Sequence, residues 1–124
     1  MKKLFKNFWL SISWSIIVLI TSITPVNLPS SHILYIQLIQ FDKIVHFLIY
    51  AILTVLLQLN FSRILENKYF ILILSFSLSL LYGLFIELIQ GITLYRTSEF
   101  FDFTANLAGI TTLTLYYYLF KCLQ

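Results

Sequence analysis

Long apolar stretches alternate with short polar ones along this chain of 124 residues. Four stretches are predominantly apolar, at residues 7–24, 43–61, 69–91 and 103–120. Each comes close to the about 20 residues that a helix needs to cross the hydrocarbon core of a bilayer. Because backbone groups in lipid must be hydrogen-bonded within the segment, the stretches predict helices despite their many β-branched residues. We therefore predict a single domain over residues 1–124, an all-α membrane protein with a bundle of four transmembrane helices.

A further apolar stretch, His32–Phe41, lies between the first two predicted helices. It is too short to span, so we expect it to form a short outer interfacial segment or to cap the bundle on that side. A hydrophobic loop packed on the helix ends and a lid over a substrate are two alternative roles.

Lysine and arginine residues are unevenly distributed between the predicted loops. Six of the eight lie at the N-terminus, in loop 62–68 or near the C-terminus, whereas the other side has Lys43 and Arg96. Since these residues are enriched in cytoplasmic loops, both termini are predicted to be cytoplasmic, with loops 25–42 and 92–102 outside. A basic start before an apolar run is also typical of a signal peptide, but no A-x-A-like cleavage site follows it, which favours an uncleaved anchor.

The composition is that of a membrane protein. Hydrophobic residues make up 60% of the chain and charged residues 10%, against about a quarter charged residues in soluble domains. The net charge of +3 comes from residues that flank the predicted helices rather than from one basic patch, which argues against a nucleic-acid partner. The lone cysteine, Cys122, excludes an internal disulfide and a cysteine-based metal site.

Polar residues gather in two parts of the chain, at 42–50 and 83–109. Residues four apart share one helix face, so the last three predicted helices each carry a polar stripe near the outer end of the bundle. Ionisable groups in or beside a bilayer are costly, which makes these stripes candidates for function. The candidate binding residues are Asp42, Lys43, Tyr50, Gln90, Arg96, Asp102 and Asn106.

Structural alternatives exist for several of these residues. Asp42 and Asp102 stand at predicted helix starts, where a carboxylate caps free backbone N–H groups. Asn106 is of the type that bridges helices by hydrogen bonds, and glycines at 83 and 109 permit close helix packing. Tyr50 has an alternative role as an aromatic residue at the membrane interface.

His46 and Glu87 are the two catalytic candidates, as acid–base groups. Glu87 lies about one turn inside the outer end of its helix, where an ionisable group needs a partner; a buried ion pair that locks the bundle is the alternative. Histidine serves as proton carrier, metal ligand and phosphate donor, so all three roles stay open for His46, beside that of a hydrogen-bonded core residue.

The charges at the outer end give −2 with a neutral histidine, from Asp42, Glu87, Glu99 and Asp102 against Lys43 and Arg96. Such an acidic excess favours a divalent cation that recruits phosphate over direct capture of phosphate. The sequence nevertheless has no paired histidines, no H-E-x-x-H and no Gly-rich phosphate loop. We therefore assign no metal ligands and leave the cofactor unknown.

At these positions the chain resembles the VanZ-like family of bacterial membrane proteins, named after the teicoplanin resistance protein VanZ. The resemblance covers the last three predicted helices and rests on a D-K-x-x-H-F-x-x-Y stretch, a G-x-x-x-E-x-x-Q stretch, an arginine and a D-x-x-x-N-x-x-G stretch. These fall on Asp42 to Tyr50, Gly83 to Gln90, Arg96 and Asp102 to Gly109. Ser22–Pro25 also looks like the family. The resemblance implies a cell-envelope protein, in some members linked to lowered glycopeptide susceptibility, and supplies no established reaction.

The leading hypothesis is a protein of the bacterial cytoplasmic membrane that binds an envelope lipid or a lipid-linked cell-wall precursor by its headgroup at the outer leaflet. Whether it also modifies that headgroup, and so whether it is an enzyme, stays open. In this hypothesis Arg96 and Lys43 hold an anionic group, because arginine offers a bidentate fork. A non-catalytic structural or partner-binding protein with a polar interhelical lock is the alternative, and a small transporter is a third.

Overall fold

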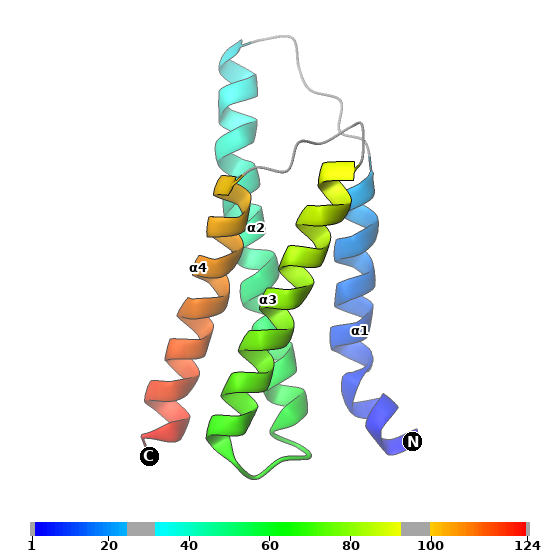
Figure 1. Ribbon diagram of the computed structural model, residues 1–124, viewed down its shortest axis with the longest axis vertical. Coiled ribbons are helices and arrows are strands. Elements are labelled where there is room, and N and C mark those ends of the chain that lie inside the picture. Colours follow the sequence, from blue (N-terminus) through cyan, green and yellow to red (C-terminus); the bar gives the residue numbers. More distant parts are fainter. Residues whose placement is uncertain (1, 25–31, 93–99, 124) are drawn as a thin grey trace.

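The computed structural model describes residues 2–24, 32–92 and 100–123, and within these ranges every regular element is a helix. The helices are α1 (Lys2–Ile23), α2 (His32–Phe61), α3 (Lys68–Ile92) and α4 (Phe100–Tyr117), and a π-helical turn, Tyr118–Cys122, continues α4. They form a bundle with both chain termini at one end (Figure 1). The predicted all-α fold of four helices is confirmed.

α2 differs from the prediction at its N-terminal end. It begins at His32 and runs without interruption to Phe61, so His32–Phe41 is part of this helix and not a separate interfacial segment. This part of α2 projects beyond the ends of the other helices (Figure 1). The physical reason is that residues 30–61 contain neither glycine nor proline, so nothing in the sequence ends the helix before Asp42.

The two aspartates that the sequence places at helix starts have different positions. Asp42 lies about three turns inside α2, so its predicted role as a helix cap is wrong. Asp102 stands in the first turn of α4, where the helix dipole favours a carboxylate. At the opposite end of the bundle, Asn67 Oδ1 accepts a hydrogen bond from Phe70 N at 3.1 Å and caps the start of α3.

α2 contacts each of the other helices, and most closely α4. A Cβ atom built on Gly109 of α4 would lie 2.2 Å from the backbone oxygen of Phe47, so the two backbones touch there. A Cβ on Gly83 of α3 would lie 3.3 Å from the ring of Tyr50. The prediction that both glycines permit close helix packing is confirmed.

Polar contacts between helices run along the whole bundle and not only at the predicted site. Asn60 Nδ2 donates to Ser11 Oγ at 2.7 Å, and Thr54 Oγ1 donates to Ser79 Oγ at 3.0 Å. Trp14 Nε1 donates to the backbone oxygen of Ile49 at 3.1 Å. Such bonds satisfy polar groups that are costly to bury and tie α1 and α3 to α2.

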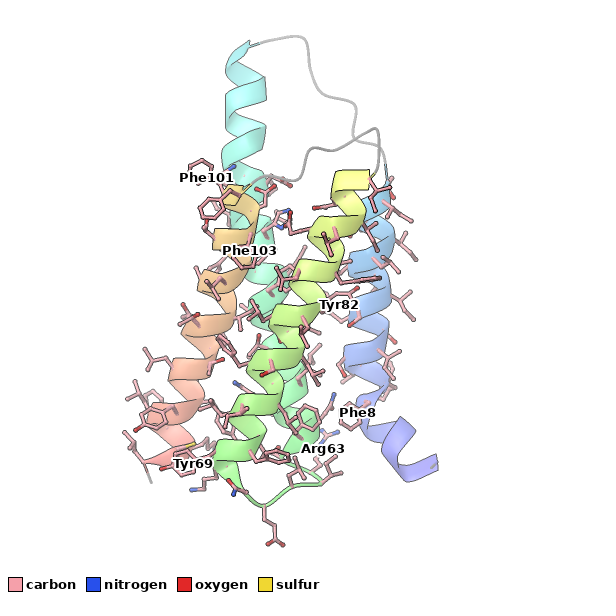
Figure 2. The ribbon with its side chains drawn as sticks, in the orientation of Figure 1. Phe8, Arg63, Tyr69, Tyr82, Phe101 and Phe103 are labelled. Atoms are coloured by element: carbon pink, nitrogen blue, oxygen red, sulfur yellow. The ribbon has the colours of Figure 1, made fainter. Side chains whose placement is uncertain are left out.

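The outer surface of the bundle is apolar. Two helices, Phe41–Phe61 and Lys68–Ile92, are long and apolar enough to cross a membrane by length and composition, and Phe8–Ile23 is a shorter apolar helix. Large apolar side chains are exposed on all four helices, up to 83% at Ile92. Phe101 and Phe103 lie near one end of the bundle and Phe8 and Tyr69 near the other (Figure 2). The four-span topology and the cytoplasmic termini remain predictions.

Candidate functional site

A polar cluster lies at the end of the bundle opposite the termini, where α3 finishes and α4 begins (Figure 1). It draws on three helices, because residues one turn apart share a helix face. Four of its members are at least nine-tenths buried on α3 and α4, and His46 on α2 is equally buried. We call this set the polar cluster; it comprises Asp42, Lys43, His46, Glu87, Gln90, Asp102 and Asn106.

A chain of hydrogen bonds runs through the centre of the polar cluster. Asn106 Nδ2 donates to Glu87 Oε1 at 3.1 Å, and Asn106 Oδ1 lies 2.9 Å from His46 Nδ1. Since a carboxylate oxygen accepts, the amide NH₂ of Asn106 faces Glu87, and its carbonyl oxygen is left to accept from His46. The proton of a neutral His46 ring is thereby placed on Nδ1, and its Nε2 becomes an acceptor.

An ion pair and a contact between a histidine and a carboxylate flank this chain. His46 Nε2 lies 3.7 Å from Asp42 Oδ2, one turn earlier on α2. Lys43 Nζ lies 3.7 Å from Asp102 Oδ1 and so links α2 to α4. The same ammonium stands 5.8 Å from the centre of the Phe101 ring, a cation–π contact. Lys43 is therefore held over the start of α4.

A cavity of about 80 Å³ adjoins the polar cluster between α1, α2 and α3. Its polar walls include Asp42 and His46, with Thr21 and Ser22 of α1, and its deeper lining is apolar. Tyr50 also lines it. The Tyr50 side chain is 1% exposed, and its hydroxyl has no hydrogen-bond partner among the described residues. A space of this size admits a few water molecules or a small polar group, but not a whole lipid.

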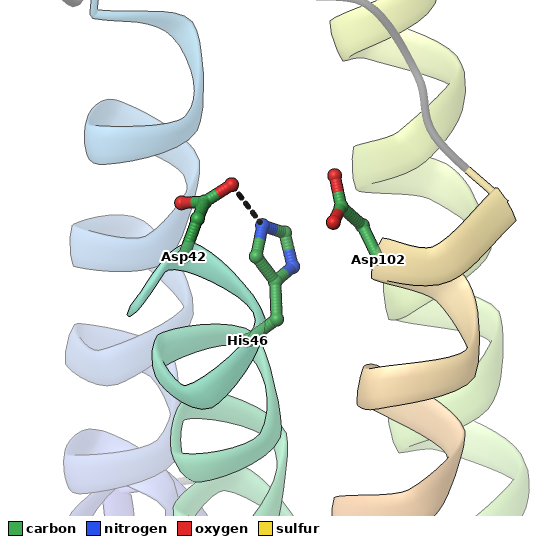
Figure 3. Close-up of side chains that lie close together, drawn as sticks. All are labelled: Asp42, His46 and Asp102. Carbon is green, nitrogen blue, oxygen red and sulfur yellow. Dashed lines mark ion pairs between the residues drawn. The ribbon is translucent and has the colours of Figure 1, made fainter. Parts of the chain in front are cut away.

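The charges of the described polar cluster leave an acidic excess. Asp42, Glu87 and Asp102 oppose Lys43, which gives −2 with a neutral histidine. The ligand-type atoms of Asp42, His46 and Asp102, one from each side chain, all lie within 4.8 Å of one another. Figure 3 shows the His46 ring between the two carboxylates. One imidazole and two carboxylates form a donor set that divalent cations use.

Eight of the nine sequence-predicted site residues lie at this end of the bundle, and Arg96 lies outside the described residues. The two catalytic candidates, His46 and Glu87, are joined through Asn106. Gln90 is 2% exposed, one turn beyond Glu87 on α3. Sequence reasoning missed the part that α1 plays, since Thr21 and Ser22 on the cavity wall stand in an apolar helix without a charged neighbour.

It also missed buried polar residues in the lower half of the bundle, which belong to the helix contacts rather than to the site. They are Thr54, Gln58, Asn60, Ser75 and Ser79. Their positions 54 and 58, and 75 and 79, are one turn apart on their helices, and this spacing is the signal that could have revealed them.

Comparison with known proteins agrees with the motifs of the polar cluster. Neither the curated proteins nor the solved structures gave a match. A family model described as VanZ/LLP1 matches residues 2–121, which takes in α1 as well as the three helices that carry the polar cluster. The chain therefore belongs to the VanZ-like family and is a VanZ-like envelope protein.

Proposed function

We propose that this protein sits in the bacterial cytoplasmic membrane and binds the headgroup of an envelope lipid or of a lipid-linked cell-wall precursor at the outer leaflet. The observation that carries the proposal is the cavity beside the polar cluster. Polar side chains of α1 and α2 and apolar side chains of α1, α2 and α3 line it together. Pockets that orient an amphiphile pair an apolar lining with a few placed polar groups.

Membrane insertion is supported by the apolar surface. Two helices are long and apolar enough to cross a bilayer, and exposed residues such as Ile92 and Leu88 would be unfavourable in water. The polar cluster, by contrast, is turned inward among the helices, as expected of ionisable groups near the membrane.

Headgroup binding assigns separate roles to the polar residues. Lys43, half-buried and held over Phe101, supplies positive charge for an anionic group, and Arg96 is expected to add a bidentate contact. His46 and Glu87 are the acid–base candidates if the headgroup is modified. Asn106 orients both of them. The proposal also includes an effect on teicoplanin susceptibility, and this part rests on the family resemblance.

Lipid retention by the purified protein tests the proposal. We expect native mass spectrometry to show that the wild type retains phosphatidylglycerol or a polyprenyl pyrophosphate in preference to a zwitterionic lipid. Lys43→Gln should lower this retention several-fold at unchanged abundance of folded protein, while Lys68→Gln, at the other end of the bundle, should not. Equal retention by wild type and Lys43→Gln at equal abundance would count against headgroup binding.

A second candidate is a non-catalytic lock between helices, favoured by the hydrogen bonds that join His46, Asn106 and Glu87 across α2, α4 and α3. Breaking a buried polar network costs folding stability first. Glu87→Gln separates the two candidates, because glutamine keeps an acceptor oxygen for Asn106 but removes the charge. Normal abundance with lost lipid retention or altered teicoplanin susceptibility supports the site, whereas a wild-type phenotype supports the lock.

A further inference from the structure

We infer that Asp42, His46 and Asp102 form a binding site for one divalent transition-metal cation of the Zn²⁺ type. This inference departs from the sequence analysis, which assigned no metal ligands, because spacing along the chain does not reveal that α4 brings Asp102 beside His46. It rests on side-chain geometry alone and not on the proposed headgroup recognition.

The His46 ring is oriented like that of a metal-binding histidine. Asn106 Oδ1 accepts a hydrogen bond from His46 Nδ1–H, and Asn106 Nδ2 donates one to Glu87. Metal-binding histidines usually donate their other ring N–H to an oxygen in this way, which fixes the tautomer and leaves the second nitrogen to the metal. His46 Nε2 is therefore presented as a ligand before any cation binds.

His46 Nε2 faces a carboxylate oxygen of Asp42. In the neutral ring this nitrogen and Asp42 Oδ2 are two acceptors, 3.7 Å apart. A proton on Nε2 would also relieve their repulsion, but charge-assisted hydrogen bonds are shorter, at about 2.7–2.9 Å. Two ligands of one tetrahedral Zn²⁺ lie about 3.4 Å apart, given bonds of about 2.0–2.1 Å. The observed separation is closer to that of two ligands of a shared cation.

The third ligand comes from α4. The ligand-type atoms of Asp42, His46 and Asp102 lie within 4.8 Å of one another (Figure 3), so small side-chain rotations bring all three onto one ion.

The adjoining cavity supplies the open side of the site. Asp42 and His46 line it, so water or a ligand oxygen can reach a cation bound between them. Tyr50 lines the same cavity one turn further along α2, and its buried hydroxyl has no hydrogen-bond partner among the described residues. Three protein ligands with a fourth position open to water are the arrangement of catalytic zinc sites.

Zinc binding to the full chain tests the inference. The protein is purified in detergent without added lipid, stripped with a chelator, and titrated with Zn²⁺ and separately with Mg²⁺. We expect one Zn²⁺ per chain and much weaker binding of Mg²⁺, which prefers oxygen ligands and its own waters. Asp42→Asn, His46→Gln and Asp102→Asn should each weaken Zn²⁺ binding at least tenfold. Asn106→Ala should weaken it about tenfold by releasing the ring.

Matched controls keep the result interpretable. His32→Gln and Glu66→Gln replace one imidazole and one carboxylate away from the site and should bind Zn²⁺ like the wild type. Asp42→His exchanges one ligand for another and should retain binding. X-ray absorption of the wild-type complex should show nitrogen and oxygen ligands with the scattering of one imidazole, a readout that does not require any variant to fold.

Two results would overturn the inference: no stoichiometric Zn²⁺ in the wild type, or bound Zn²⁺ without an imidazole ligand. Because lipid is absent from this titration, its failure leaves the proposed headgroup binding untouched. A wild type that retains no anionic lipid but still binds Zn²⁺ would likewise reject the headgroup proposal alone.

Discussion

Asn106 joins three helices through one side chain. It stands on α4, accepts from His46 of α2 and donates to Glu87 of α3, and it is 1% exposed. The amide has one acceptor and one donor side, so it can satisfy two different buried partners at once. Its residue type and its place one turn into the helix predict that this asparagine bridges helices, and the structure identifies the two partners.

Replacing Asn106 by alanine should destabilise the bundle, because both of its partners lose a hydrogen bond in a buried place. We expect the free energy of unfolding to fall by about 1–3 kcal/mol. Denaturant unfolding in detergent, followed by loss of helical signal, measures the change. Thr112→Ala is the control on the same helix, since Thr112 is exposed and bonds only to the backbone of its own helix in the contacts described. Equal unfolding of the two variants would contradict the bridging role.

The contact between α2 and α4 depends on Gly109, which has no side chain to keep the helices apart. A Cβ on residue 109 would collide with the backbone oxygen of Phe47. This oxygen belongs to the backbone of α2 and cannot move aside as the end of a side chain can. At Gly83 the nearest atom is instead on the ring of Tyr50, a side chain with more freedom to shift. The two glycines therefore differ in how tightly the helices constrain them.

Gly109→Ala should force α2 and α4 apart and lower the unfolding free energy by about 1–3 kcal/mol, the range for overpacked cores. Gly83→Ala should cost less. Thermal unfolding of the purified variants shows which of the two substitutions lowers the stability more. A Gly83→Ala variant that is less stable than Gly109→Ala would show that the backbone contact is not the tighter constraint.

The helix boundaries agree with the sequence-based prediction at some positions and differ from it at others. The C-terminal ends of α1 and α3, at Ile23 and Ile92, lie within one residue of the predicted limits at 24 and 91, whereas α1 begins five residues before the predicted residue 7. The predicted start of α2 is wrong because Asp42, although polar, does not mark a helix boundary. A charge does not end a helix whose backbone remains hydrogen-bonded, and nothing else in residues 30–61 does so.

Charge is distributed unequally between the two ends of the whole molecule. The end with both termini also holds the α2–α3 turn with Arg63 (Figure 2) and Lys68 at the start of α3. Six of the eight Lys and Arg residues therefore belong to this end. The polar cluster lies at the other end. If the helices cross a membrane, this bias directs the termini to the cytoplasm and the polar cluster outward.

The lone cysteine makes this orientation measurable. In intact cells, Cys122 should be unreactive towards a membrane-impermeant maleimide and should react after permeabilisation, since a cytoplasmic C-terminus is shielded by the membrane. Phe100→Cys, at an exposed position, in a Cys122→Ser background, should react from outside. Labelling of Cys122 in intact cells would reverse the predicted topology.

By itself the sequence determined the helical class, the number of helices and the residue types of the polar cluster, because these follow from local periodicity and from the cost of placing charge among apolar residues. Only the tertiary structure decided that Asn106 stands between His46 and Glu87, that Lys43 reaches Asp102, and that Asp102 lies beside His46. Helical spacing fixes which residues share a face of one helix. Rotation and depth between helices depend on packing, here on the close contact at Gly109, and these set which faces meet.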